Sequence, residues 1–487
     1  MPGKRTSAQV RKSLSHPIVD ADGHLLEIGP VLFDYLRQVG GAKACESFLK
    51  TESATNELFL LAKHRWHDLT WEQRREARLL PPSWWSFPAK NTLDRATVSL
   101  PRLLRSRMDE LGIDFSVLYP TVAMGFAAIA DEELRRVACR AYNTYAAELF
   151  RDCADRMTPA AVIPMVTPQE AIEEMEFAVK QLGLKAVMIG IVRRPIPALA
   201  KERPDLAHLA FRLDTLAFES AHDYDPLWAA CVRLKVAAVS HSRASGWDSR
   251  RSYRNGIFNH LGHFGAAGEA LCRSLFMGGV TRRFPMLNFG FLEGGSVWGA
   301  SLYNSLVAHW EKRNPRSLRE NLDPAKINRG MLLRLAKEYG HPKVQAKLGE
   351  IEAYLNRPFP PPANLDEWEP CKIKRAGDIH DLFVPRFYFG CEADDEMNGY
   401  AYNAKANRFG ARLRTVMGSD IGHWDVTDTK DVVAEAHELV ERDLMTERDF
   451  KDFVFTNAVR LHGGMNRDFF KGTPVEREAA KVLARDA

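Results

Sequence analysis

Cysteine is scarce and scattered in this chain. Seven cysteines occur among 487 residues, and none belongs to a C-x-x-C pair. An odd number of isolated thiols argues against a disulfide framework and favours a reducing compartment. The sequence therefore predicts a cytoplasmic protein that depends on its core rather than on covalent cross-links.

A strong excess of charge of one sign is also missing. The 67 lysines and arginines nearly balance 63 aspartates and glutamates, which leaves a formal net charge of +4. Nucleic-acid binding usually needs clustered basic residues, so we expect no nucleic-acid partner. No uncharged apolar run reaches the ~20 residues of a membrane helix, and no signal-peptide core follows the basic N-terminus. We therefore expect no membrane partner either.

The chain does contain ample material for a large core, with 45% hydrophobic and 27% charged residues. Short apolar runs rich in Val, Ile and Phe end at polar residues and alternate with helical stretches. This alternation is typical of repeated β-α units around a parallel sheet. The candidate strands cover residues 18–21, 115–119, 160–164, 186–190, 236–240, 287–292, 386–390 and 415–417. Eight such runs predict an α/β fold of the (β/α)8 TIM-barrel type.

The barrel is expected to form a single domain over residues 16–475. A basic N-terminal arm (1–15) precedes it, and a C-terminal tail (476–487) follows it. Two stretches, about 37–107 and about 300–380, exceed a minimal barrel and are interpreted as mainly helical insertions.

Helices are expected over residues 131–151, 167–182 and 432–442, and T-P-Q-E at Thr167 predicts a capping box. The first insertion contains PPSWWSFP, and aromatic patches of this kind often mark interfaces. We therefore expect an oligomer, formed either by identical chains or with a paralogue.

Acidic and imidazole side chains follow the first expected strand. Asp20, Asp22 and His24 are spaced two residues apart. On a regular strand this spacing places three side chains on one face, and active sites of such barrels lie at the carboxyl ends of the strands. The alternative is that VDADGH is only a polar loop.

The same residue types recur where other expected strands end. Carboxylates and imidazoles that meet at a barrel mouth lose solvation and repel one another unless a cation compensates them. The pattern therefore predicts a divalent metal. The candidate ligands are Asp22, His24, His241, Glu293 and Asp420, with Glu27, His260 and His263 in reserve.

Six segments resemble the amidohydrolase superfamily, and within it the amidohydrolase-related group that includes non-oxidative decarboxylases. They are VDADGHLLE, LGIDFSVLYPT, AAVIPMVTPQEAIEEMEFAVKQLGLKAVMIG, PLWAACVRLKVAAVSH, GGVTRRFPMLNFGFLEGG and MGSDIGHWD. The resemblance implies a metal site at the carboxyl end of the barrel, with His241 as a ligand and Asp420 as the catalytic aspartate. Two positions depart from the family, because Asp22 and Glu293 stand where histidines are common.

These departures bear on the metal. Oxygen-rich sites suit manganese or iron, whereas imidazole-rich sites suit zinc. We therefore expect one or two ions of manganese or iron, with zinc as the alternative. The fourth expected strand ends without the lysine that bridges two metals in some members of the superfamily, so Glu293, Asp22 or Glu27 would have to bridge a pair.

Three functions remain open. In the first, Asp420 and Glu293 assist a metal-activated water in hydrolysis or decarboxylation of a small organic acid or amide, and Arg243 and His423 bind the substrate. In the second, a carboxylate-bridged Fe or Mn pair uses O2 to hydroxylate a small amino acid or similar substrate. This site resembles that of the amidohydrolase-like alpha-aminoisobutyrate hydroxylase. In the third, the chain is a non-catalytic partner of an active paralogue.

Overall fold

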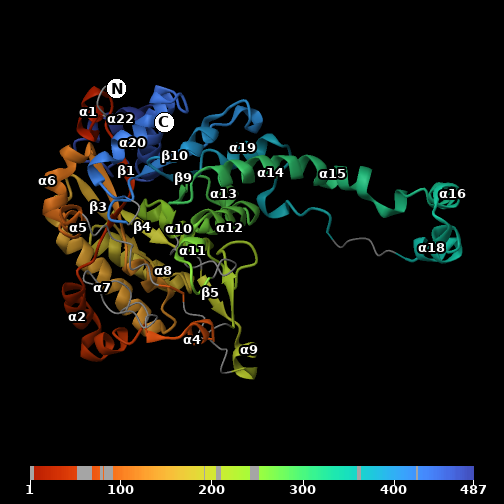
Figure 1. Cartoon of the computed structure of the whole chain (residues 1–487), viewed down its shortest axis with the longest axis horizontal. Helices are drawn as coiled ribbons and strands as arrows, with labels where there is room; N and C mark the ends of the chain where they lie inside the picture. Colours follow the sequence, from red (N-terminus) through yellow and green to blue (C-terminus); the bar gives the residue numbers. More distant parts are fainter. Residues whose placement is uncertain are drawn as a thin grey trace.

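The computed structural model describes residues 5–51, 68–76, 80–81, 91–190, 192–203, 210–241, 252–358, 364–423 and 426–486. Eight parallel strands form one sheet, and helices surround it (Figure 1). The strands are β1 (Val19–Leu25), β2 (Phe115–Pro120), β3 (Met157–Val162), β4 (Ala186–Ile189), β7 (Ala238–Ser240), β8 (Phe289–Phe291), β9 (Phe387–Glu392) and β10 (Arg414–Gly418). Every expected strand is present in the expected order, so the predicted (β/α)8 barrel is confirmed.

The ring closes where β1 meets β10. The backbone N–H of Asp420 donates to the carbonyl of Asp22 (3.0 Å). The Asp20 carboxylate accepts hydrogen bonds from Ser419 N (2.9 Å) and Ser419 Oγ (2.8 Å), and from Ser116 Oγ on β2 (2.6 Å). Asp20 therefore fastens β1 to the strands on both of its sides.

The helices pack on the outside of the sheet or extend its loops. They are α1 (Ser7–Ser13), α2 (Gly29–Phe48), α4 (Trp71–Glu76), α5 (Thr92–Ser99), α6 (Pro101–Leu111), α7 (Glu132–Phe150), α8 (Pro168–Glu176), α9 (Pro197–Glu202), α10 (Asp225–Leu234), α11 (Gly256–His260), α12 (His263–Met277), α13 (Val280–Arg283), α14 (Val297–Arg313), α15 (Pro315–Ser317), α16 (Arg329–Tyr339), α17 (Pro342–Gln345), α18 (Leu348–Leu355), α19 (Gly377–Phe383), α20 (Val432–Glu441), α21 (Glu447–Lys451) and α22 (Glu476–Arg485). Among the described helices, none is long and apolar enough to cross a membrane.

The expected helix starts are reproduced in detail. Thr167 Oγ1 accepts a hydrogen bond from Glu170 N, and Glu170 Oε1 accepts one from Thr167 N, each at 3.2 Å. This reciprocal pair is the predicted capping box of α8. Asp131 caps α7 in the same position by accepting from Leu134 N (2.8 Å).

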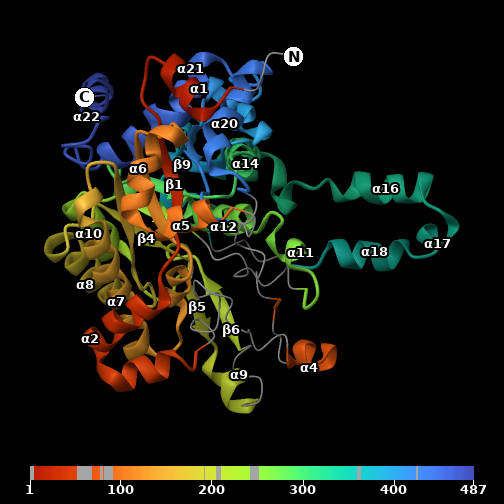
Figure 2. The ribbon, with the colours of Figure 1, turned by 60° about the vertical axis from the view of Figure 1, so that its left-hand side comes forward.

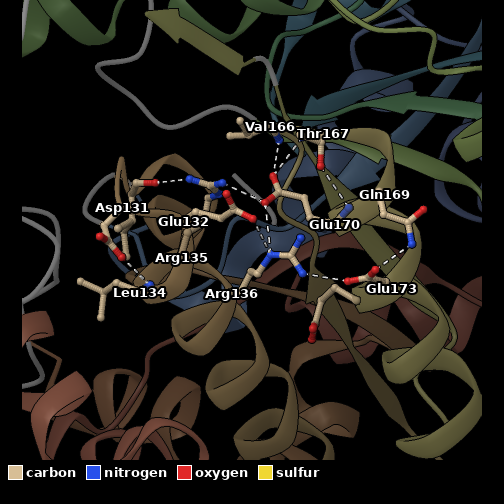
Figure 3. A network of polar contacts seen from close by, with 12 residues as sticks. Asp131, Glu132, Leu134, Arg135, Arg136, Val166, Thr167, Gln169, Glu170 and Glu173 are labelled. Carbon is tan, nitrogen blue, oxygen red and sulfur yellow. Dashed lines mark hydrogen bonds and ion pairs between the residues drawn. The ribbon is translucent and has the colours of Figure 1, made fainter.

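A buried ion pair locks α7 to α8 (Figure 3). Arg135 Nη2 lies 2.8 Å from Glu170 Oε2, and the two side chains are only 3% and 1% exposed. Arg136 and Glu173 extend the network toward solvent with a 2.8 Å contact. Because Glu170 also closes the capping box, one carboxylate fixes both the start of α8 and its position against α7.

Both ends of the described chain are helical and packed. The expected N-terminal arm contains α1, where Ser7 Oγ accepts hydrogen bonds from Val433 N and Ala434 N at the start of α20 (3.1 Å each). The expected tail contains α22, which buries Val482 and Leu483. A two-stranded antiparallel hairpin, β5 (Val192–Pro195) and β6 (Phe211–Asp214), was not expected from the sequence. All seven cysteines are free and buried.

The second expected insertion is helical and leaves the body of the protein. Residues 314–358, called the helical arm below, follow α14 and contain α15 to α18. Both ribbon views show the arm projecting away from the barrel (Figures 1 and 2). No residue from 308 to 358 is buried. In the first insertion, α2 and α4 to α6 are helical, whereas most of PPSWWSFP lies outside the described residues.

Candidate metal centre

Six ionisable side chains meet at the carboxyl ends of four strands. Two groups of side chains have ligand atoms that all lie within 4.8 Å of one another, and the groups share His24. One group contains Asp22, His24 and His241, and the other contains His24, Glu293, Asp420 and His423. These six residues are called the ligand cluster below. It includes all five of the principal ligands expected from the sequence.

The donor atoms in the first group converge on one point. His24 Nε2 and His241 Nε2 are 3.3 Å apart. Asp22 Oδ1 lies 3.7 Å from His24 Nε2 and 3.6 Å from His241 Nε2, and it receives no hydrogen bond from the described residues. Donors each about 2.1 Å from one metal and about 100° apart are separated by about 3.2 Å. The spacing of these three atoms therefore fits a shared divalent cation.

The second group adds two carboxylates to the same site. Glu293 Oε2 lies 3.2 Å from His241 Nε2, and Asp420 Oδ1 lies 3.3 Å from His24 Nε2. Asp420 Oδ1 is also 2.6 Å from His423 Nδ1. A mixture of imidazole nitrogens and carboxylate oxygens is the donor set of a transition-metal site.

The electrostatics of the cluster also call for a cation. Burial raises the pKa of Asp22 well above its ordinary value, and the neighbouring Glu293 and Asp420 carboxylates raise it further, although His241 opposes them. Burial lowers the pKa of His24 well below its ordinary value, and the imidazoles of His423 and His241 add to the effect. A divalent cation would stabilise the charged carboxylate and the neutral imidazole together.

Backbone strain marks the two carboxylates proposed for catalysis. Glu293 has φ of 60° and Asp420 has φ of 47°, in the left-handed region that non-glycine residues rarely adopt. Such conformations persist where the surrounding structure imposes them, and they concentrate at functional sites. After Glu293, the chain passes Gly294, where a Cβ would lie 2.9 Å from the Trp298 indole nitrogen. Gly294 of the FLEGG turn therefore leaves no room for a side chain, and the turn that places Glu293 at the site needs glycine there.

His24 is oriented by the neighbouring strand. Its Nδ1 lies 3.3 Å from the carbonyl oxygen of Pro120. Because a carbonyl can only accept a hydrogen bond, Nδ1 carries the proton and the lone pair of Nε2 faces the ligand cluster. A backbone partner of this kind is typical of histidines that bind metals.

Asp20 does not join the ligand cluster, although its spacing suggested the same face as Asp22 and His24. The pairing of β1 with β2 shifts by one residue between Asp20 and Gly23. A bulge of this kind reverses the alternation of side chains along a strand. Asp20 consequently binds Ser116 and Ser419 and supports the site from the barrel wall.

The reserve candidates lie outside the two groups. The Glu27 carboxylate accepts hydrogen bonds from Val122 N (3.0 Å) and Ala123 N (2.8 Å), at the start of a 3-10 turn. His260 Nε2 lies 4.0 Å from Glu293 Oε1 at the edge of the site. His263 is buried at the start of α12, with its ring against Phe264. Arg243 lies outside the described residues.

Two features of the site were missed from the sequence. Tyr119, on β2, is fully buried with its ring centroid 5.8 Å from that of His241, and its hydroxyl forms no hydrogen bond within the described residues. Burial raises the pKa of Tyr119 well above its ordinary value, and Asp22 adds to this. A small pocket of about 90 Å³ also adjoins Asp420, and its described lining includes four more carboxylates but no lysine or arginine. These are Glu392, Asp394, Asp428 and Glu435.

Comparison with known proteins agrees with this architecture. A family model described as "Amidohydrolase" matches residues 66–321, which is more than half of the chain. An amidohydrolase from Mycobacterium avium subsp. paratuberculosis K-10 has 17% identity and a TM-score of 0.54, over 92% of this chain and 100% of that one.

Two decarboxylase structures are more distantly similar. A dihydroxybenzoic acid decarboxylase from Polaromonas sp. JS666, with bound manganese and 2-nitroresorcinol, has 16% identity and a TM-score of 0.49, over 94% of this chain and 99% of that one. A 2,6-dihydroxybenzoate decarboxylase from Rhizobium has 16% identity and a TM-score of 0.46, over 92% of this chain and 98% of that one. From the family match, this chain belongs to the amidohydrolase family, and its ligand cluster supports a metal-dependent enzyme of that family.

Proposed function

We propose that the protein uses a divalent metal to activate water against a small organic acid or amide, in hydrolysis or non-oxidative decarboxylation. The ligand cluster carries this proposal, because it places two strained carboxylates against buried imidazoles at the carboxyl end of the barrel. When bound there, the metal supplies a water molecule with a pKa lowered toward about 7 and polarises a substrate carbonyl.

Asp22, His24, His241 and Glu293 are the residues proposed to hold the metal. Their donor atoms lie close together although they come from three strands, β1, β7 and β8, and β1 is not paired with either of the other two. Asp22 and Glu293 make the donor set richer in oxygen than a set of histidines. This composition favours manganese or iron over zinc.

Asp420 is the proposed proton acceptor, and His423 is proposed to pass the proton on. Asp420 Oδ1 and His423 Nδ1 are 2.6 Å apart, within hydrogen-bond distance. The Asp420 side chain is 5% exposed, whereas that of His423 is 16% exposed. The imidazole therefore connects the buried carboxylate to the more open side of the site, as an oriented partner of a general base should.

The pocket beside Asp420 bears on the substrate class. Its carboxylate lining would repel a second anionic group of the substrate, although Lys430 partly compensates Asp428 at 2.8 Å. A neutral or cationic group of the substrate is better matched to this side of the site. Neutral amides are therefore to be tested before dicarboxylic acids.

A second candidate function is O2-dependent hydroxylation by a dinuclear iron or manganese centre. The observation that favours it is the division of the cluster into two donor groups that share His24, with carboxylates in both. Carboxylates can bridge two metals, so this arrangement offers room for a pair.

Metal analysis of the purified protein, combined with oxygen uptake, tests the proposal. About one metal per chain and turnover without oxygen consumption would support hydrolysis or decarboxylation. Two iron or manganese ions per chain with substrate-dependent oxygen uptake would favour the second candidate. No bound metal after reconstitution would contradict both candidates and favour a non-catalytic partner. If the wild type binds metal, an unchanged metal affinity in Asp22→Asn would remove Asp22 from the proposed ligands.

A further inference from the structure

The helical arm exposes an unusual concentration of large apolar side chains. Between 37% and 76% of the surface of each is exposed, and nothing in the described chain covers them. They are Leu322, Ile327, Met331, Leu332, Tyr339, Val344 and Tyr354. Large exposed apolar side chains gathered in one segment are typical of an interaction site.

The arm lacks the means to be stable by itself. It contains no buried residue, and its packed part, α16 to α18, spans only residues 329–355, whereas packed units below about 40 residues usually need disulfides, metals or oligomerisation. Its residues include no cysteine, and its one histidine, His341, accepts a hydrogen bond from Lys343 N at the start of α17 (3.3 Å). Oligomerisation is the remaining way to stabilise the arm. The partner must then be present whenever the arm is folded.

The charges of the arm favour a second copy of this chain as that partner. Helix α16 carries Arg329, Arg334, Lys337 and Glu338, for a net charge of +2. Helix α18 carries Glu350 and Glu352, for a net charge of −2, and Lys347 just before it forms an exposed ion pair with Glu350. In a dimer with two-fold symmetry, contacts between α16 and α18 occur twice, so opposite charges on the two helices are complementary between copies.

We propose that the helical arm is a dimerisation element in which α16 and α18 of one chain pack against α18 and α16 of a second copy. The four helices bury the exposed apolar side chains between them, as in a helical bundle. The direction of the arm, away from the barrel in both ribbon views, leaves its helices accessible to the second copy (Figures 1 and 2).

Sedimentation of the full-length protein tests the proposal directly. The wild type should sediment as a dimer at micromolar concentration, and Leu332→Glu should raise the dimer dissociation constant by at least about tenfold. Leu199→Glu is the matched control, because Leu199 is a similarly exposed leucine on α9 of the body (51% against 44% for Leu332). It should leave the dissociation constant unchanged.

Charge reversal tests the pairing of the helices. Arg334→Glu and Glu352→Arg should each weaken the dimer by about twofold to fivefold, as expected for charges at an interface rim. In the double variant each helix has no net charge, but the two substituted positions again carry opposite charges, so the dissociation constant should return toward the wild-type value. Both side chains are exposed, so disruption of the arm itself is not expected.

A monomeric wild type would overturn the proposal, including a monomer that assembles only with a different protein. A dimer that is insensitive to Leu332→Glu would place the interface elsewhere and also overturn it. If the double variant weakens the dimer by the sum of the two single effects, the proposed packing of α16 against α18 is overturned.

Discussion

The ligand cluster and the helical arm distribute charge and apolar surface in opposite ways. The cluster gathers six ionisable side chains where water is largely excluded, whereas the arm exposes seven large apolar side chains where water is abundant. Each arrangement is unfavourable for an isolated chain. The comparison is the basis of the two proposals, in which a cation completes the cluster and a second copy of the chain completes the arm.

The two regions also differ in what supports them. The cluster is held by the parallel strands and by buried partners such as Asp20, so a substitution there should affect chemistry more than folding. Within the part of the chain that the structure describes, the arm has no buried residue and thus no comparable support. The difference in support can therefore be tested by comparing a substitution at a buried position of the body with a similar substitution at an exposed position.

The largest effect is expected at Asp420. Asp420→Asn keeps the left-handed backbone, which asparagine tolerates, but removes the negative charge and the proton acceptor. Turnover should fall by at least about 100-fold, the lower range for loss of a general base. Asp443→Asn is the matched control, because Asp443 is also left-handed (φ of 55°) but exposed, and its steady-state kinetics should match the wild type. Equal activity of the two variants would remove Asp420 from the chemistry.

The buried ion pair between α7 and α8 should show the next largest effect, on stability. Arg135→Met removes the close partner of buried Glu170 and leaves only Arg136 at 3.9 Å, and loss of one partner of a buried ion pair typically costs about 3–5 kcal/mol of unfolding free energy. Arg316→Met removes an exposed partner of Glu320 at the base of the arm and should cause no measurable change. Urea denaturation of both variants measures the difference, and similar losses would contradict the contrast.

A smaller, pH-dependent effect is expected at His462. Burial lowers the pKa of His462 from 6.5 to about 3, and its ring stacks on Phe469 at 4.6 Å. As the pH falls below 6.5, the unfolded chain binds a proton that the folded chain does not, so stability decreases with falling pH. The contribution is about 1.4 kcal/mol per pH unit well below that value.

His462→Phe should therefore reduce the loss of stability between neutral pH and pH about 5. His341→Gln, at an exposed histidine of the helical arm, should retain the wild-type loss. Thermal unfolding at a series of pH values distinguishes the two variants. If the stability of His462→Phe fell with pH as steeply as that of the wild type, His462 would not be buried as a neutral imidazole.

The smallest effect is expected at helix caps. Thr167→Ala removes the capping box of α8 and should cost about 1 kcal/mol of global stability. Asn328 caps α16 by accepting a hydrogen bond from Met331 N (2.9 Å), but α16 lies in the arm. Asn328→Ala should therefore leave the unfolding of the barrel unchanged, as measured by denaturant titration of a barrel-specific signal.

Much of the fold could be predicted because its signals are local. Apolar runs such as 186–190 and 236–240 are bounded by polar residues, and the Thr167 capping box depends on residues within one helical turn. The acidic and imidazole residues at the ends of β1, β7, β8 and β10 could be predicted in the same way, because they closely follow apolar runs of this kind. The hairpin of β5 and β6 has no comparable apolar pattern, since Arg193 and Arg194 occupy its first strand.

The amino-acid sequence alone determined the number and order of the barrel strands, the helix caps and the acidic and imidazole groups available at the strand ends. Only the tertiary structure decided that Asp22 joins the ligand cluster while Asp20 binds serines, that Glu27 caps a turn, and that residues 314–358 leave the body. The physical reason is that a bulge, a distant hydrogen-bond donor and an uncovered helix depend on contacts between segments remote in the chain, whereas strand and helix periodicity is written within a few neighbouring residues.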